Sequence, residues 1–240
     1  MWSSRGNVLR GLALAAVLLV PGLSFANTTD AFSAFQTVSN SASNLWSYWS
    51  DGTTSLTNYD STIVLMPTPF TGNCGFGTSC WFNGTDNSVI LQNATGSPAA
   101  FGDGGTAPNG LLTYYPRLST VVVRFTAPTA GNYSVTGSFA NTSATPSATE
   151  WAIVPGGILS SAILDTTSGG SLPFSDLVAL SAGETLDFIV AGGDCTAIGC
   201  NQSATAFDAT IQSSATPEPV SLVLLGTGMG FFGLCRRRRG

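Results

Sequence analysis

The 240-residue sequence contains no histidine and no lysine, and only 9% of its residues are charged. Without histidine there is no Ser-His-Asp triad, no Cys-His nucleophile pair and no histidine-bound metal. Without lysine there is no Schiff-base or Ser-Lys chemistry. Hydrolysis by two carboxylates stays open, because a glycosidase needs only a pair of acids.

Positive charge is also scarce in the middle of the chain. Two of the eight arginines lie in the first ten residues, and four form the block 236–239. Only Arg117 and Arg124 remain between residues 27 and 214, where they face twelve acids, a net charge of −10. Such a segment has too few cations to release counterions from phosphates, so nucleic acid and anionic lipid are not expected partners.

The first 26 residues have the three parts of a secretory signal peptide. Arg5 and Arg10 form a positive start, and Gly11–Val20 is a short apolar core. Ser24-Phe25-Ala26 then offers small residues at the two positions that signal peptidase reads. We therefore expect residues 1–26 to be removed by signal peptidase during export, with a buried N-terminal helix as the alternative.

The other end of the chain, residues 215–240, has the features of a membrane segment. Pro217-Glu218-Pro219 is followed by the uncharged stretch Val220–Cys235. Sixteen helical residues span roughly 24 Å, against about 30 Å for a bilayer core. Positive flanks stay in the cytoplasm. We therefore expect a single transmembrane helix held on its cytoplasmic side by Arg236, Arg237, Arg238 and Arg239.

This tail resembles the PEP-CTERM sorting signal. The matching parts are Pro217-Glu218-Pro219, Ser221-Leu222-Val223-Leu224-Leu225-Gly226 and the arginine block 236–239. The resemblance implies that a bacterial exosortase cuts an inner-membrane precursor near Pro217, Glu218 and Pro219. It also implies a mature protein at the cell surface or in the extracellular exopolysaccharide matrix of a biofilm. A plain C-terminal anchor is the alternative.

Five cysteines remain to be placed. Export permits disulfides, and two local bridges, Cys74 with Cys80 and Cys195 with Cys200, are favoured among the three connectivities that four cysteines allow. Zinc is the rival hypothesis, but the chain has no histidine and the first pair lacks the usual ligand spacing. Cys235 belongs to the tail. We expect no metal and no cofactor.

Residues 27–214 predict one all-β domain, with its core over about residues 40–212. Thr120–Thr126 is rich in valine, and Tyr133–Phe139 alternates strictly between apolar and small polar residues. Short strands separated by turn residues at about ten-residue spacing favour an antiparallel, jelly-roll-like β-sandwich. Further strands are expected at Ile63–Met66, Ser88–Leu91, Trp151–Val154, Ile158–Leu164, Phe174–Leu180, Thr185–Val190 and Ala206–Ile211. The segments Thr71–Asn87 and Thr95–Gly110 are expected to be loops.

Part of this domain resembles secreted bacterial jelly-roll modules. Phe125–Phe139 follows their pattern aromatic-x-Ala-Pro-x-x-Gly-x-Tyr-x-Val-x-Gly-x-Phe, and Leu180–Val190 is similar to their later strand pair. The resemblance implies the architecture of galactose-binding-like and carbohydrate-binding modules. Where such modules often carry Asp-Thr before the last strand, this chain has Asn201-Gln202-Ser203, so an inherited metal site is not expected.

Several residues are candidates for function. Trp46, Trp49 and Trp81 could stack on sugar rings, with core packing as the alternative. The region of Asp86 could supply oxygen ligands to calcium, although turn chemistry explains it better. Six N-x-S/T triplets reflect composition or mark glycosylation, and they begin at Asn27, Asn83, Asn93, Asn132, Asn141 and Asn201.

These features together predict an exported, non-catalytic protein with a structural or adhesive role and glycan binding. The alternative is a secreted carbohydrate-active enzyme that uses two carboxylates. Two acids about 5–10 Å apart in an aromatic cleft would favour the enzyme. Glu150 and Glu184 are the only glutamates of the mature domain, and each is expected to be a solvated acid at a strand edge or turn.

Overall fold

The computed structural model describes residues 26–51, 63–72, 74–75, 77–100, 105–117, 119–143, 149–154, 160–164, 170–192 and 204–214. The expected signal peptide up to residue 25, the tail from residue 215, and Cys195 with Cys200 lie outside these ranges. Within them, no helix is long and apolar enough to cross a membrane.

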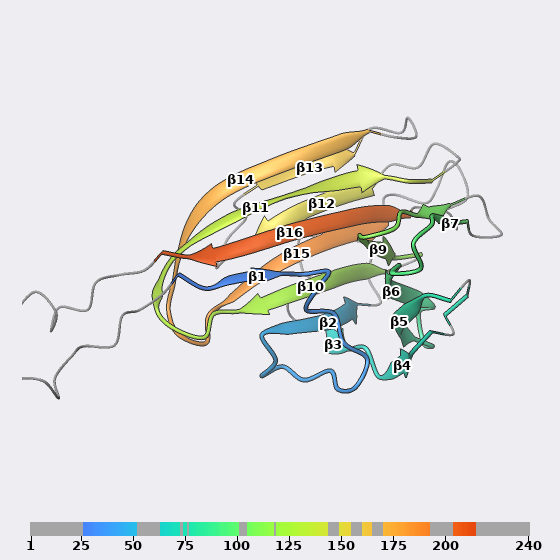
Figure 1. Cartoon of the computed structure of the whole chain (residues 1–240), viewed down its shortest axis with the longest axis horizontal. Coiled ribbons are helices and arrows are strands. Elements are labelled where there is room, and N and C mark those ends of the chain that lie inside the picture. The colour runs from blue at the N-terminus through green and yellow to red at the C-terminus, as the bar shows by residue number, and fades with distance from the viewer. Residues whose placement is uncertain are drawn as a thin grey trace, which may run out of the picture. The chain divides into compact units, whose positions relative to one another are not determined.

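The strands form two main antiparallel sheets (Figure 1). The larger sheet has eight strands, ordered β14 (Ser171–Leu180), β11 (Gly131–Asn141), β16 (Thr205–Ser213), β9 (Leu112–Tyr115), β6 (Ser88–Gln92), β5 (Ser79–Asn83) and β4 (Thr68–Phe70), with β1 (Thr28–Asp30) paired to β16. The smaller sheet has the order β13 (Ser160–Leu164), β12 (Thr149–Val154), β15 (Thr185–Gly192), β10 (Thr120–Thr126), β2 (Trp46–Asp51) and β3 (Val64–Leu65).

The predicted all-β antiparallel fold is confirmed, and its strand patterns are explained by burial. In β11, the side chains of Tyr133, Val135 and Phe139 are buried, while Asn132 and Thr136, which alternate with them, are exposed. Successive side chains of a strand point to opposite faces, so one face of β11 enters the core and the other meets solvent.

Aromatic side chains from both sheets fill the space between them. Phe188 of the smaller sheet and Phe207 of the larger sheet have ring centroids 5.0 Å apart. Tyr114 lies 5.2 Å from Phe207, and its hydroxyl donates to the carbonyl oxygen of Phe188 at 3.1 Å. This hydrogen bond joins the two sheets through the core and satisfies a phenol that is fully buried.

Gly137 explains one position of the jelly-roll pattern. It faces the core, where a Cβ would lie 2.0 Å from the carbonyl oxygen of Asp208 and 2.5 Å from the ring of Phe174. Only glycine fits so close to the neighbouring strand β16. The tyrosine of the pattern is fixed as well, because the Tyr133 hydroxyl donates to the carbonyl of Thr129 in the preceding turn at 2.6 Å.

Two segments predicted as loops contain strands. β5 lies within the expected loop Thr71–Asn87, and its pairing with β6 outweighs the local Gly and Asn content. The segment Thr95–Gly110 carries the short ribbon of β7 (Ala99–Ala100) and β8 (Thr106–Ala107). Ala99 and Ala107 of this ribbon are buried together with Cys80 and Leu91 of the larger sheet.

The first and last strands of the domain are neighbours. Thr28 pairs with Gln212, and the Ser214 N–H donates to the Asn132 carbonyl at 2.8 Å. Both ends of the segment Thr28–Ser214 therefore leave at the same end of the larger sheet (Figure 1). We call this the terminal end, and it also carries the turns 127–130 and 181–184.

Candidate functional site

Two of the three tryptophans proposed to stack on sugars are part of the core. Trp46 is 2% exposed, and its ring centroid lies 5.4 Å from that of Phe125. Trp81 is 3% exposed, and its indole N–H donates to the carbonyl of Gln36 at 2.7 Å. A stacking role for Trp46 and Trp81 was therefore wrong, because their ring faces are not available to a ligand.

Trp49 lies on the opposite side of the smaller sheet. It alternates with Trp46 and Tyr48 along β2, so its side chain points away from the core between the sheets. Its direct cross-strand neighbour is Val122 of β10, whose next neighbour is Ile189 of β15. Trp49 packs against these two buried residues and is itself half-buried.

A polar row crosses the same three strands beside Trp49. Ser47, Arg124 and Asp187 are direct cross-strand partners. Arg124 donates from Nε and Nη2 to the two carboxylate oxygens of Asp187, both at 2.6 Å. The Trp49 indole N–H donates to the Ser47 hydroxyl at 2.8 Å. We name Ser47, Trp49, Arg124 and Asp187 the tryptophan–arginine cluster.

The tryptophan–arginine cluster is preorganised. The side chain of Asp187 is 2% exposed and that of Arg124 is 14% exposed, so the ion pair is largely withdrawn from water. The Arg124 guanidinium also lies 5.0 Å from the centroid of the Trp49 ring, within cation–π range. A half-exposed aromatic ring beside a planar donor group can contact the apolar face and the hydroxyls of a sugar.

Sequence reasoning identified Trp49 but missed its partners. Arg124 and Asp187 are far apart in the chain, and no local motif links them. Strand alternation could have shown that Ser47 and Trp49 share one face of β2. It could likewise have placed Val122 with Arg124 on one face of β10, and Asp187 with Ile189 on one face of β15. The pairing of the three strands, which brings these residues into rows, is not a local property.

Two acids meet elsewhere, on the larger sheet. Asp208 of β16 is half-buried; burial raises its pKa, and the negative charge of Asp30 and a hydrogen bond with that side chain raise it further. Asp30 also accepts a hydrogen bond from the Ser33 N–H at 2.8 Å. The two side chains contact each other directly, whereas glycosidase carboxylates are separated by about 5–10 Å to admit the sugar.

Other acids take part in turns. Glu184 is exposed and accepts a hydrogen bond from the Ser181 N–H at 2.8 Å, as expected for a turn acid. Asp86 accepts from the N–H and the hydroxyl of Ser88 and from the Asn83 amide, which also agrees with the turn interpretation. The side chain of Glu150 lies outside the described part of the chain.

Three of the N-x-S/T triplets have a structural explanation. The side chains of Asn83, Asn93 and Asn141 are buried, and each Oδ1 accepts a hydrogen bond from the N–H two residues later, at 3.0, 3.1 and 2.9 Å. This is an Asx turn, and each one closes a strand of the larger sheet. Asn27 and Asn132 are exposed.

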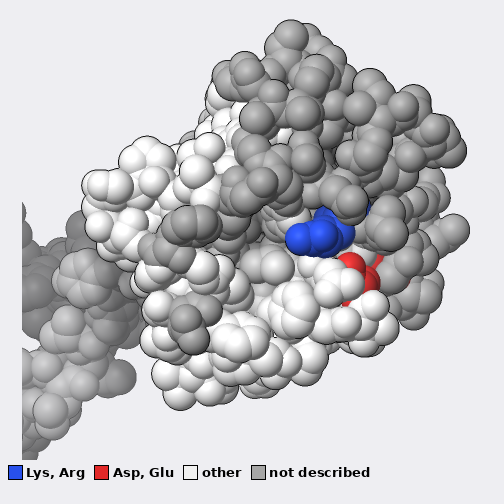
Figure 2. Space-filling model, turned by 90° about the vertical axis from the view of Figure 1, so that its right-hand side faces the viewer, with Lys and Arg blue, Asp and Glu red and all other residues white. Residues whose placement is uncertain are grey.

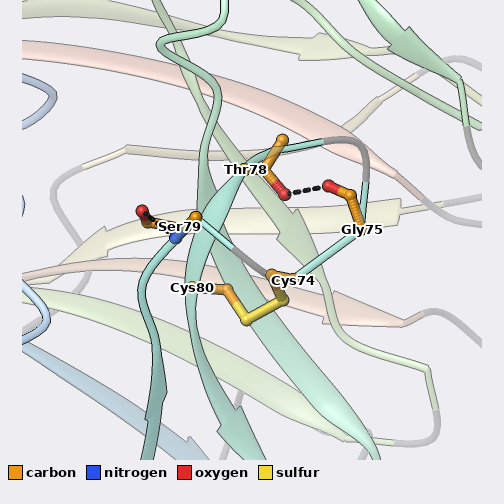
Figure 3. Close-up of a disulfide and its surroundings, with 6 residues drawn as sticks. Cys74, Gly75, Thr78, Ser79 and Cys80 are labelled. Carbon is orange, nitrogen blue, oxygen red and sulfur yellow. Dashed lines mark hydrogen bonds between the residues drawn. A yellow bond between two sulfur atoms is a disulfide. The ribbon is translucent and has the colours of Figure 1, made fainter.

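The predicted bridge between Cys74 and Cys80 is confirmed (Figure 3). The two cysteines are six residues apart in the sequence, and between them the Thr78 hydroxyl donates to the Gly75 carbonyl at 2.7 Å. Cys80 is fully buried on β5. Among the residues that the structure describes, no group of three or more Cys, Asp or Glu could hold a metal ion.

Charged side chains are sparse on the described part of the surface. In the face drawn in Figure 2, one small basic area and one small acidic area lie in a described surface that is otherwise uncharged. Arg117 is half-buried, and its guanidinium lies 5.0 Å from the centroid of the Tyr115 ring. The two arginines of the domain are therefore both held against aromatic rings.

Comparisons with known proteins give weak likenesses only. No family model matches the chain, and no curated protein matches it. Solved structures with a similar arrangement include a family 35 carbohydrate-binding module from Clostridium thermocellum (16% identity, 53% of this chain and 93% of that chain, TM-score 0.30). Others are TmCBM61 in complex with β-1,4-galactotriose (12%, 57% and 87%, 0.34) and the K3 adhesin domain of Lys-gingipain from Porphyromonas gingivalis (14%, 50% and 92%, 0.31). At these TM-scores the likenesses support no functional argument, and the β-sandwich assignment rests on strand pairing.

Proposed function

We propose that this chain is an exported bacterial protein of the cell surface or extracellular matrix, cut at its C-terminal signal, with a structural or adhesive and non-catalytic role. The order of Pro217-Glu218-Pro219, the uncharged stretch and the arginine block carries the proposal, and the pairing of β1 with β16 fits it. A domain held through its C-terminal strand then has both chain ends at the terminal end. We propose that the opposite end of the larger sheet faces the surroundings.

The charge of the domain supports a polysaccharide environment. Arg124 is paired with Asp187, which leaves Arg117 as the only other arginine between residues 27 and 214 that could face phosphates. The exposed face of β11 carries mainly hydroxyl and amide side chains, such as Asn132 and Thr136, whereas that of β14 combines Ser171 and Ser175 with the apolar Pro173, Leu177 and Ala179. Hydroxyl and amide groups both donate and accept hydrogen bonds, as sugar hydroxyls do.

The tryptophan–arginine cluster is the glycan contact in this proposal. Trp49 supplies part of an aromatic face, and the Arg124 guanidinium, held by Asp187 through Nε and Nη2, lies over the Trp49 ring. Because the cluster carries a paired rather than a net charge, it suits an uncharged glycan. A carbohydrate-active enzyme stays the second hypothesis, but the Asp30–Asp208 contact does not favour it, since no sugar fits between the two groups.

Two experiments test these points separately. Surface labelling and fractionation of the native host should place the protein outside the inner membrane. Replacement of Glu218 should instead keep the protein in the inner membrane as an uncut precursor. Binding of the purified domain to matrix polysaccharide should weaken in Trp49→Ala and persist in Trp49→Phe, with Phe70→Ala, another exposed aromatic, as the control. Equal binding by all three variants would remove the cluster from the proposal.

A further inference from the structure

The folded domain ends very close to the motif at which cleavage is proposed. Ser213 is still paired with Tyr133, and Ser214 is still hydrogen-bonded to Asn132. Only Ala215 and Thr216 then precede Pro217. The three residue steps from Ser214 to Pro217 reach about 10 Å when fully extended. An enzyme that holds the peptide at Pro217 must therefore come within that distance of Ser214.

The terminal end is broad compared with this reach. β1, β16, β11 and β14 lie side by side here, and strands are about 4.8 Å apart, so three intervals give a width of about 14 Å. The turns 127–130 and 181–184 extend the surface, and they are tied together because the Ala127 N–H donates to the Glu184 carbonyl at 2.9 Å. A protein surface that reaches Pro217 therefore meets more than the single strand β16.

The end of β16 is held on both sides. On one side it pairs with β11, and on the other it pairs with β1 through Thr28, Thr29 and Asp30. β1 is fixed in turn, because the Trp46 indole N–H donates to the Thr29 hydroxyl at 2.9 Å. Releasing the end of β16 to lengthen the free peptide would break both sets of pairs. The enzyme therefore meets this end folded.

We propose that the terminal end is a contact surface for the enzyme that cuts at Pro217–Pro219, an inference that rests on the proposed function. Thr28, Asn132 and Gln212 are exposed there, as are the turn residues 128–130 and 181–184. Glu184 is the only charged residue among these, so the matching enzyme surface is polar and nearly uncharged. The contact depends on the fit between the two surfaces, and a bulky, positively charged side chain at its edge obstructs it.

The test follows removal of the tail from the full-length chain in its native host, by pulse labelling and mass analysis. Asn132→Arg changes an exposed side chain and leaves its carbonyl bond to Ser214 intact. We expect it to slow cutting about fivefold or more, the effect of a one kcal/mol penalty. Six Gly and Ser residues inserted between Thr216 and Pro217 should restore the wild-type rate in that variant, and alone should not slow cutting.

Thr85→Arg is the matched control. Thr85 is exposed in the β5–β6 turn, at the other end of the larger sheet, and this variant should be cut like wild type. If Asn132→Arg is cut at the wild-type rate, or stays slow with the longer linker, the contact is overturned while the proposed processing stands. If the wild-type chain keeps its tail, both are overturned.

Discussion

Replacing Gly137 with alanine is expected to destabilise the domain more than any ordinary change of one methyl group. The new Cβ would lie 2.0 Å from the backbone oxygen of Asp208, which cannot turn aside as a flexible side chain could. β11 and β16 must separate locally, and the ring of Phe174, at 2.5 Å, must also move. Overpacking of this kind costs about 1–3 kcal/mol or more, and we expect at least about 2 kcal/mol here because backbone is involved.

The assay is thermal unfolding of the purified domain, followed by circular dichroism. A loss of about 2 kcal/mol corresponds to a fall in Tm of about 4–8 °C for a chain of this size. Gly131→Ala is the matched control, because its added Cβ meets nothing within 4 Å. It should leave Tm unchanged or raise it slightly, since alanine has less backbone freedom to lose on folding. If Gly137→Ala melted with the wild type, the close approach of β11 to β16 would be refuted.

Four further changes have defined outcomes. Asp208 has a raised pKa in the folded state, so the folded state binds a proton more readily than the unfolded chain. The free energy of unfolding therefore falls as pH rises from the ordinary aspartate pKa through the raised one. Asp208→Asn should flatten this part of a Tm–pH profile and stabilise the domain at neutral pH, and an unchanged slope would count against the acid pair. Asp187→Ala removes the carboxylate that Arg124 binds and should cost roughly 3 kcal/mol in denaturant unfolding, whereas replacing both residues by leucine should cost clearly less. Tyr133→Phe removes the bond to Thr129 and should cost about 1 kcal/mol by the same assay, with no loss taken as evidence against that bond. Removing the Cys74–Cys80 bridge with two serines should cost about 2 kcal/mol, and a reductant should lower Tm less in this variant than in the wild type; equal sensitivity of the two proteins would count against the bridge.

Patterns within single strands were enough to predict much of the fold. Thr120–Thr126 is β10 as expected, and the alternation from Tyr133 to Phe139 matches the buried and exposed faces of β11. The strand β5 was missed because glycine and asparagine around it read as loop, while its stability comes from pairing with β6 and from the buried Trp81. β1 has only three residues, too few for any periodic signal.

The candidate site was less accessible to sequence reasoning. Aromatic character alone does not distinguish Trp46 from Trp49. Alternation along β2 places Trp46 in the core and points Trp49 outward. The partners Arg124 and Asp187, and likewise Asp30 and Asp208, come together only because distant strands pair. Such contacts depend on topology, which a single sequence does not specify residue by residue.

Processing at both ends of the chain is tested most directly by the intact mass of the protein recovered from its native host. Together with its C-terminal peptide, the mass should describe a chain that begins near Asn27 and ends near Pro217, with or without an added group. A chain that still carries Arg236–Arg239 would show that the tail is an ordinary membrane anchor and would contradict the proposed sorting.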